Sequence, residues 1–205
     1  MSHHLVVALA YDGLCTFEFG CAVEVFSLER PELDVDWYRF AACAESRGTV
    51  RAAGGISVQV PHGLAMLARA GTIIIPGWQG VDVAPSPMLL RRLVAAHERG
   101  ARIATICSGV FVLAATGLLD GKAATTHWRY AEVLQQRYPK IDVRPNSIYV
   151  DEGSLLTSAG SAAGLDMSTS FQPRVRNRPW RGRVPRVENC GKITGTPPRT
   201  ASPSP

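Results

Sequence analysis

The sequence contains no long hydrophobic run and no basic N-terminal region followed by an apolar stretch. A membrane-spanning helix needs about 20 consecutive, mostly apolar residues, whereas the apolar runs in this chain are only as long as a strand. The first four residues, Met1-Ser2-His3-His4, lead directly into such a run, which does not fit a secretory signal. We therefore expect a cytoplasmic protein without a membrane partner.

Cysteine is sparse and irregularly spaced. The chain has five cysteines, an odd number, with no CxxC pair and no zinc-binding spacing. Four of the five histidines also lack metal-ligand spacing, and no phosphate-binding glycine loop is present. The pattern predicts free thiols, no metal site and no cofactor. The cysteines are Cys15, Cys21, Cys43, Cys107 and Cys190.

The formal net charge of +5 comes from one end of the chain. Residues 168–205 hold eight basic residues and one acidic residue, whereas residues 1–167 hold 14 basic and 16 acidic residues. The tail also contains seven of the 14 prolines and shows no helical or strand periodicity. We expect one domain over residues 1–167, without a basic groove, followed by a disordered tail over residues 168–205.

Apolar strands alternate with amphipathic helices along residues 1–167. This alternation is typical of an α/β fold with a mostly parallel sheet covered on both faces. In such folds ligands bind at the carboxyl ends of the strands. The expected strands are 5–10, 37–44, 56–60, 72–76 and 102–106; the expected helices are 16–28, 86–99, 108–116 and 128–138, followed by a hairpin over 147–157 and a last helix from 161.

Cys107 stands directly between the strand at 102–106 and the following helix. This position predicts a tight, strained turn like the nucleophile elbow of hydrolases. Gly109 leaves room for the crossing, although Thr105 occupies a place that usually holds a smaller residue. Amides at the start of the helix would favour the thiolate of Cys107. The alternative is a buried structural cysteine at a strand end.

Several ordered motifs resemble the ThiJ/PfpI branch of the class I glutamine-amidotransferase-like superfamily. They are Tyr11-Asp12-Gly13 with Phe17-Glu18-Phe19-Gly20, Ile75-Pro76-Gly77-Trp78, 104–114 around Cys107, 117–121, 124–128 and 156–160. More narrowly, residues 5–167 are similar to the sensor half of AraC-type transcriptional regulators. The resemblance implies a flavodoxin-like, three-layer sandwich, a homodimer and an unidentified small-molecule ligand.

The resemblance also assigns roles to individual residues. Cys107 matches the reactive cysteine of the family, and Glu18 matches an acid that hydrogen-bonds this sulfur, staying protonated because of the like charge. His127 matches a histidine that could act as a base toward the thiol. The amides of Gly77 and Ser108 would be the oxyanion donors. Taken alone, Glu18 could equally be a helix N-terminal acid and His127 a hydrogen-bonded turn residue.

One position departs from the pattern of catalytically complete members. These carry a carboxylate two residues after the histidine, and here that residue is Arg129. Without an orienting acid the imidazole of His127 should have no fixed tautomer, so acyl transfer should be poor. The departure favours a sensing pocket lined by Trp78 and Trp128 over an efficient hydrolase.

The resemblance ends where the basic tail begins. AraC-type regulators continue with two helix-turn-helix units, but proline and glycine interrupt every helix-length window of residues 168–205. We hypothesise a shifted reading frame near codon 168 and expect no specific DNA binding. The alternative is a tail that binds nucleic acid or another acidic partner through its arginines.

Two functions are therefore compatible with the sequence. The first is the sensor domain of an AraC-type regulator that holds a small ligand or an oxidisable thiol at Cys107. The second is a stand-alone hydrolase, hydratase or glyoxalase-like enzyme that uses Cys107, Glu18 and His127. Arg129 and the closeness of the motif series favour the first.

Overall fold

The computed structural model describes residues 4–29, 31 and 37–169 of the chain. The predicted tail lies outside these residues except for Ser168 and Thr169. Both belong to α5 (Ser161–Thr169), so this helix continues two residues past the predicted end of the domain.

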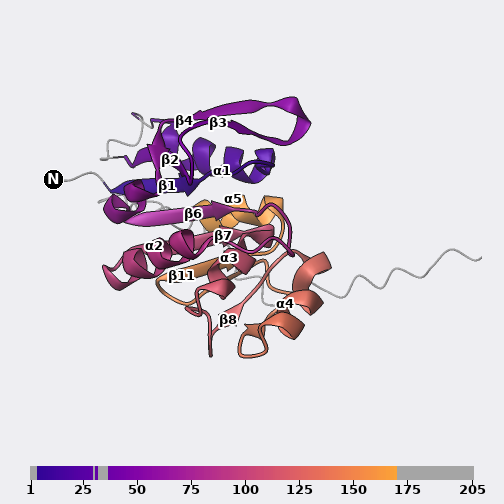
Figure 1. The fold of residues 1–205 in the computed structure, drawn as a ribbon. Coiled ribbons are helices and arrows are strands. Elements are labelled where there is room, and N and C mark those ends of the chain that lie inside the picture. The colour runs from indigo at the N-terminus through magenta and orange to yellow at the C-terminus, as the bar shows by residue number, and fades with distance from the viewer. Residues whose placement is uncertain (1–3, 30, 32–36, 170–205) are drawn as a thin grey trace, which may run out of the picture. The chain divides into compact units, whose positions relative to one another are not determined.

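A seven-stranded sheet forms the centre of the fold (Figure 1), and all its strands run parallel except β10 at one edge. The sheet order is β10-β11-β7-β6-β1-β2-β5. The parallel strands leave their carboxyl ends at one edge, where ligands bind in α/β folds. The strands are β1 (Leu5–Leu9), β2 (Arg39–Ala44), β5 (His62–Gly63), β6 (Thr72–Pro76), β7 (Arg102–Ile106), β10 (Tyr149–Asp151) and β11 (Leu155–Ser158).

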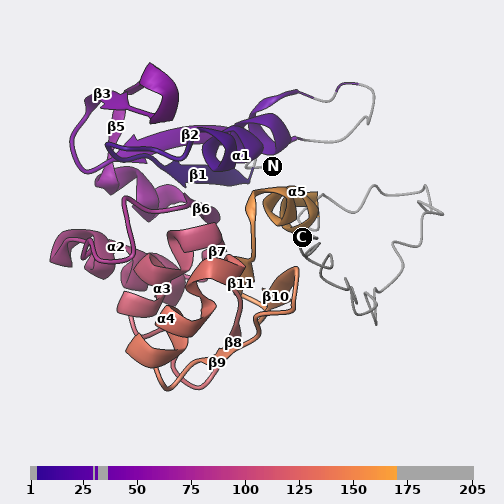
Figure 2. The ribbon, with the colours of Figure 1, turned by 90° about the vertical axis from the view of Figure 1, so that its right-hand side faces the viewer.

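Helices cover both faces of this sheet. Figure 2 shows α1 (Thr16–Ser27) beside α5 on one face, with α2 (Pro87–Glu98), α3 (Val110–Ala115) and α4 (Ala131–Arg137) on the other. The three-layer α/β sandwich predicted from the alternation of strands and helices is therefore confirmed. The central strands read as continuous apolar runs because both faces are covered; Ile73, Ile74 and Ile75 of β6 are fully buried.

Helix boundaries follow local chemistry. α2 begins after Ser86, whose hydroxyl accepts a hydrogen bond from the amide of Leu89 at 3.1 Å, and Pro87 occupies its first turn. Gly100, with a φ of +91°, follows the helix and allows the left-handed turn into β7. These signals explain why the predicted helix 86–99 agrees with α2 to within one residue at each end.

Several short elements escaped the sequence pattern. β3 (Gly48–Arg51) pairs with β4 (Ser57–Val60) as an antiparallel hairpin, of which only the second strand was predicted. The predicted helices 108–116 and 128–138 each begin with a 3-10 turn, η4 (Cys107–Gly109) and η5 (Trp128–Tyr130). Other elements that the pattern did not predict are η2 (Ala53–Gly55), η3 (Leu64–Arg69), β8 (Ala123–Ala124) and β9 (Asp142–Val143). The two or three residues of η2, β8 and β9 are too few to show a period.

Among the described residues, no helix combines the length and apolar character that crossing a bilayer requires. In the same part of the chain, no three His, Cys, Asp or Glu side chains gather into a group that could hold a metal ion.

Gly109 allows β6 and the start of α3 to approach closely. A Cβ atom at this position would lie 2.3 Å from the carbonyl oxygen of Ile75 and 3.2 Å from the amide nitrogen of Gly77. Both are backbone atoms and cannot rotate away. The glycine expected to leave room for the crossing does so, and only hydrogen fits there.

We expect Gly109→Ala to destabilise the fold by about 1–3 kcal/mol, the usual effect of overpacking. Gly20→Ala is the matched control, because Gly20 lies on the exposed side of α1 with nothing within 4 Å of an added Cβ. Alanine has the higher helix propensity, so this control should stabilise by about 0.5–1 kcal/mol. Urea unfolding measures both changes, and equal midpoints for the two variants would contradict the packing argument.

Candidate functional site

Cys107 occupies a strained turn at the carboxyl end of β7. Its φ is +55°, and it is the only described residue other than glycine with a positive φ. Such a conformation costs about 1–3 kcal/mol and persists only where its surroundings impose it. The amide and hydroxyl of Ser108 both hydrogen-bond the Cys107 sulfur. The predicted elbow is therefore present, with an amide directed at the thiol.

Burial nevertheless opposes the thiolate at this sulfur. Burial raises the pKa of the Cys107 thiol to about 11, the hydrogen bonds from Ser108 oppose this rise, and the nearby Glu18 and Cys15 add to it. The amide of Ser108 favours the thiolate, as expected for the start of the helix, but burial outweighs it. A single turn of amides does not compensate for the loss of water around the sulfur, and the thiol is protonated at neutral pH.

The start of α1 brings Glu18 and Cys15 to this site. Glu18 lies in the first turn and is 8% exposed, and its negative charge raises the pKa of Cys107. Its predicted hydrogen bond to the sulfur stays a prediction. Cys15 was expected to be an unremarkable thiol. Yet a Cβ at Gly77 would lie only 2.7 Å from its sulfur, and Cys15 also hydrogen-bonds Tyr11.

Gly77 does not serve as the predicted oxyanion donor. Its amide donates to the carbonyl oxygen of Ile106 at 3.0 Å. The pairing of β6 with β7 continues one residue beyond the strands and occupies this donor. The next amide, that of Trp78, donates to the hydroxyl oxygen of Ser108 at 3.0 Å. Of the two predicted donors, only the amide of Ser108 faces the sulfur.

The imidazole ring of His127 contacts the three residues that follow it in the chain. Its Nδ1 accepts a hydrogen bond from the amide of Arg129 at 3.3 Å, and the ring lies 5.2 Å from Trp128 and 5.8 Å from Tyr130. Nδ1 is thus the acceptor, and the proton of the neutral ring is on Nε2. The expectation of an unfixed tautomer is wrong, because an amide orients the ring instead of a carboxylate. In this state neither nitrogen is free to accept the proton of Cys107.

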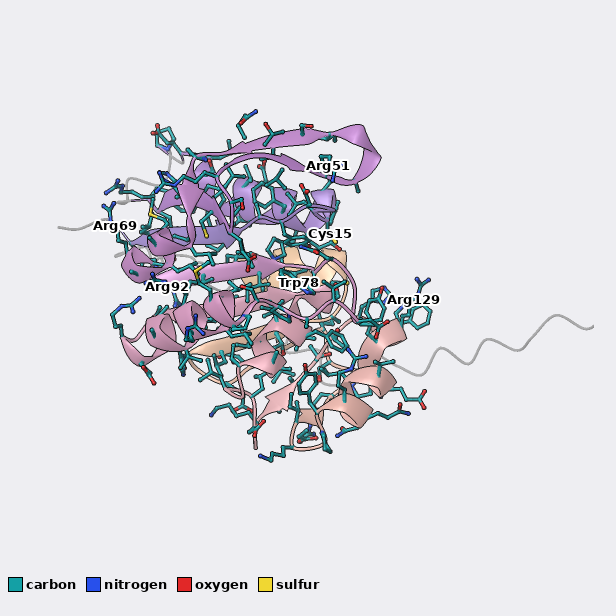
Figure 3. The ribbon with its side chains drawn as sticks, viewed as in Figure 1. Cys15, Arg51, Arg69, Trp78, Arg92 and Arg129 are labelled. Atoms are coloured by element: carbon teal, nitrogen blue, oxygen red, sulfur yellow. The ribbon has the colours of Figure 1, made fainter. Side chains whose placement is uncertain are left out.

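The two predicted pocket tryptophans differ. Trp78 is 7% exposed, lies 5.0 Å from the ring of Tyr11 and lines a cavity of about 230 Å³. Trp128 is 72% exposed beside His127 and does not line this cavity. Figure 3 shows Cys15 and Trp78 at the same end of the sheet, with Arg69 and Arg92 toward the opposite end.

Cys15 and Tyr11 were missed by the sequence analysis, although a signal was present. Cys15 stands three residues before Glu18, and this spacing places both side chains on one side of a helix start. Tyr11 follows the first strand at its carboxyl end, and its hydroxyl donates to the carbonyl of Pro76 at 2.6 Å. Together they connect the loop after β1 to the turn after β6.

The sequence matches the DJ-1/PfpI family over residues 4–172, which is most of the chain. The chain belongs to the DJ-1/PfpI family. It is 17% identical to the crystal structure of an AraC family transcriptional regulator from Pseudomonas putida. The TM-score is 0.73, over 84% of this chain and 92% of that one. At this identity the likeness shows the fold, and it agrees with the parallel sheet described above.

Curated relatives of this DJ-1/PfpI domain include regulators and an enzyme. The chain is 31% identical over 160 residues to the HTH-type transcriptional regulator CdhR of Pseudomonas aeruginosa, covering 78% of this chain and 47% of that protein. It is 36% identical over 101 residues to isonitrile hydratase of Pseudomonas putida, covering 48% and 42% respectively. A Streptomyces lividans protein named for the cpoL 5' region is 34% identical over 137 residues, covering 66% of this chain and 96% of that protein. The chain thus spans about half the length of the regulator it matches.

We expect alkylation of Cys107 by iodoacetamide to accelerate about tenfold per pH unit between pH 7 and 10 without reaching a plateau, since the pKa is raised to about 11. Glu18→Gln removes a negative charge that raises the pKa and should speed alkylation at a given pH. Ser108→Ala removes a hydrogen bond that lowers the pKa and should slow alkylation.

The measurement is peptide mass spectrometry of the Cys107 peptide, with Cys107→Ser to identify the signal. Glu24→Gln is the matched control, because Glu24 is exposed on the same helix and is not among the causes of the Cys107 shift. A plateau at or below the free-cysteine value of about 8.5 would contradict the dominance of burial.

Proposed function

We propose that this DJ-1/PfpI domain is the small-molecule sensor domain of an AraC-type transcriptional regulator and acts as a homodimer. The observation that carries the proposal is the environment of Cys107, a strained elbow in which burial raises the pKa of the thiol. A nucleophile must lose its proton to a base before it attacks. Burial and the negative charge of Glu18 both oppose this step at Cys107.

The surrounding groups support the same view. The amide of Gly77 is occupied by Ile106, and Nδ1 of His127 is occupied by the amide of Arg129. Acyl transfer needs an oxyanion donor and an oriented base acting together. A neutral thiol beside a buried Glu18 is instead suited to contact a bound molecule or to be slowly oxidised.

The relatives favour a regulatory role. CdhR is named an HTH-type transcriptional regulator, and the match to it covers 78% of this chain. Because the match spans 47% of CdhR, the activity of the whole regulator is a property of that protein. The match covers 96% of the Streptomyces lividans relative, so there the domain makes up nearly the whole protein.

The alternative is a cysteine-dependent enzyme of the hydratase type. It is favoured by the hydrogen bonds from the amide and hydroxyl of Ser108 to the Cys107 sulfur, which stabilise the thiolate. A substrate that expelled the remaining water or carried a positive charge could lower the pKa further. The similarity to isonitrile hydratase gives the substrate class to test.

We expect no turnover of simple isonitriles, amides or aldehydes by the purified chain above the rate of Cys107→Ser at pH 7–8. We also expect thermal-shift screening of small metabolites to find a ligand that raises Tm, because binding to the native state stabilises by RT ln(1 + [L]/Kd). Turnover that disappears in Cys107→Ser would reject the sensor in favour of the enzyme. Cys43→Ala is the control for loss of a thiol outside the site, because Cys43 lies in β2 and is not among the causes of the Cys107 shift.

A further inference from the structure

A cavity of about 230 Å³ opens at the carboxyl ends of β1 and β2, and Cys107 is not part of its wall. Its lining includes residues 9–12 at the end of β1 and Thr49 and Val50 of β3. Trp78 and Gln79 of the loop after β6 also line it. Pockets for drug-sized ligands measure about 300–1,000 Å³, so this one suits a smaller molecule.

The two acidic side chains that line the cavity, Asp12 and Glu45, both have hydrogen-bond partners. Asp12 accepts from the amide of Arg51 at 3.0 Å and pairs with its guanidinium at 3.3 Å. These contacts lower the pKa of Asp12. A carboxylate oxygen of Glu45 accepts a hydrogen bond from the hydroxyl of Ser86. Both acids of the cavity wall therefore have partners.

Arg47 is the cation of this wall, and it makes no hydrogen bond or ion pair with any residue that the structure describes. A guanidinium presents up to five N–H donors in a planar fork that matches a carboxylate. Its nearest recorded contact is with Gly63, where an added Cβ would lie 3.6 Å from Nε. The donors of Arg47 remain available to an anion in the cavity.

Two aromatic side chains also line the cavity. Tyr11 and Trp78 are almost fully buried, and their ring centroids are 5.0 Å apart. The indole of Trp78 is fixed because its Nε1 donates to the carbonyl of Val83 at 2.7 Å. A cavity lined both by a fixed indole and by an arginine without a described partner suits a molecule with one apolar end and one anionic end.

We propose that this cavity binds a small carboxylate, with its anionic group on Arg47 and its apolar part against Trp78. The proposal deepens the proposed sensor function and rests on it, because the bound carboxylate is a signal only if the domain is a sensor. It places that ligand beside the elbow. Trp78 is common to both sites, because its side chain lines the cavity while its amide donates to the hydroxyl of Ser108 next to Cys107.

The test is titration of the full chain with benzoate and with phenylacetate, followed by NMR of the Trp78 indole N–H, which is assigned with Trp78→Phe. The neutral isosteres benzamide and phenylacetamide are titrated in parallel. Low ionic strength is used because Arg47 is exposed and salt screens its charge. We expect saturable shifts with the acids and at least tenfold weaker binding of the amides.

Arg47→Gln should weaken binding of the acids at least tenfold, and Arg47→Lys should give an intermediate affinity, since it keeps the charge without the fork. Arg92→Gln, on the exposed side of α2, is the control and should bind as the wild type does. Circular dichroism tests whether each variant is folded. If Arg47→Gln is unfolded, the affinity of Arg47→Lys decides the question.

The proposal is overturned if neither acid gives a saturable shift, if acids and amides bind alike, or if the Arg47 variants bind like the wild type. Different results would reject the proposed sensor function while leaving the cavity proposal intact, or the reverse. Carboxylate binding together with Cys107-dependent turnover of an isonitrile would keep the cavity and remove the sensor. A ligand found by thermal shift that leaves the Trp78 resonance unchanged would keep the sensor and remove the cavity.

Discussion

The structure around Cys107 depends on the close approach of two backbones, β6 and the first turn before α3. Only hydrogen fits between Gly109 and the carbonyl oxygen of Ile75, where an added Cβ would lie 2.3 Å from that oxygen. The same approach lets the amide of Gly77 reach the carbonyl of Ile106. The chain must then turn within one residue from strand to helix, and Cys107 adopts its positive φ as the consequence.

This close approach also explains why the elbow does not by itself make an active site. The turn after β6 takes up the amide of Gly77, which was the expected oxyanion donor, in a hydrogen bond to the carbonyl of Ile106. Burial then raises the pKa of Cys107 more than the amide of Ser108 lowers it. A position typical of nucleophiles and a reactive thiolate are therefore separate properties, and the second requires charges that this site does not supply.

The sequence predicted those parts of the molecule whose signals are local. β6 and β7 are buried apolar runs, and the stop at Gly100 and the small residue at Gly109 are chemical requirements of single positions. The features that it did not predict arise from contacts between distant segments. The proximity of Cys15 to Gly77, and the balance that sets the pKa of Cys107, exist only once α1 is packed on the sheet. The tautomer of His127 was misjudged because a backbone amide replaces the expected carboxylate.

Trp78 gives the elbow and the cavity a physical connection. Its amide donates to the oxygen of Ser108, which leaves the hydroxyl proton of Ser108 free to donate to the Cys107 sulfur. A molecule that displaced Trp78 would change this donor and hence the pKa of Cys107. Coupling of this kind is reciprocal. If a bound carboxylate changes the ionisation constant of Cys107 by some factor, ionisation of Cys107 changes the affinity for the carboxylate by the same factor. In the proposed sensor, Trp78 would therefore connect ligand occupancy with the ionisation of Cys107.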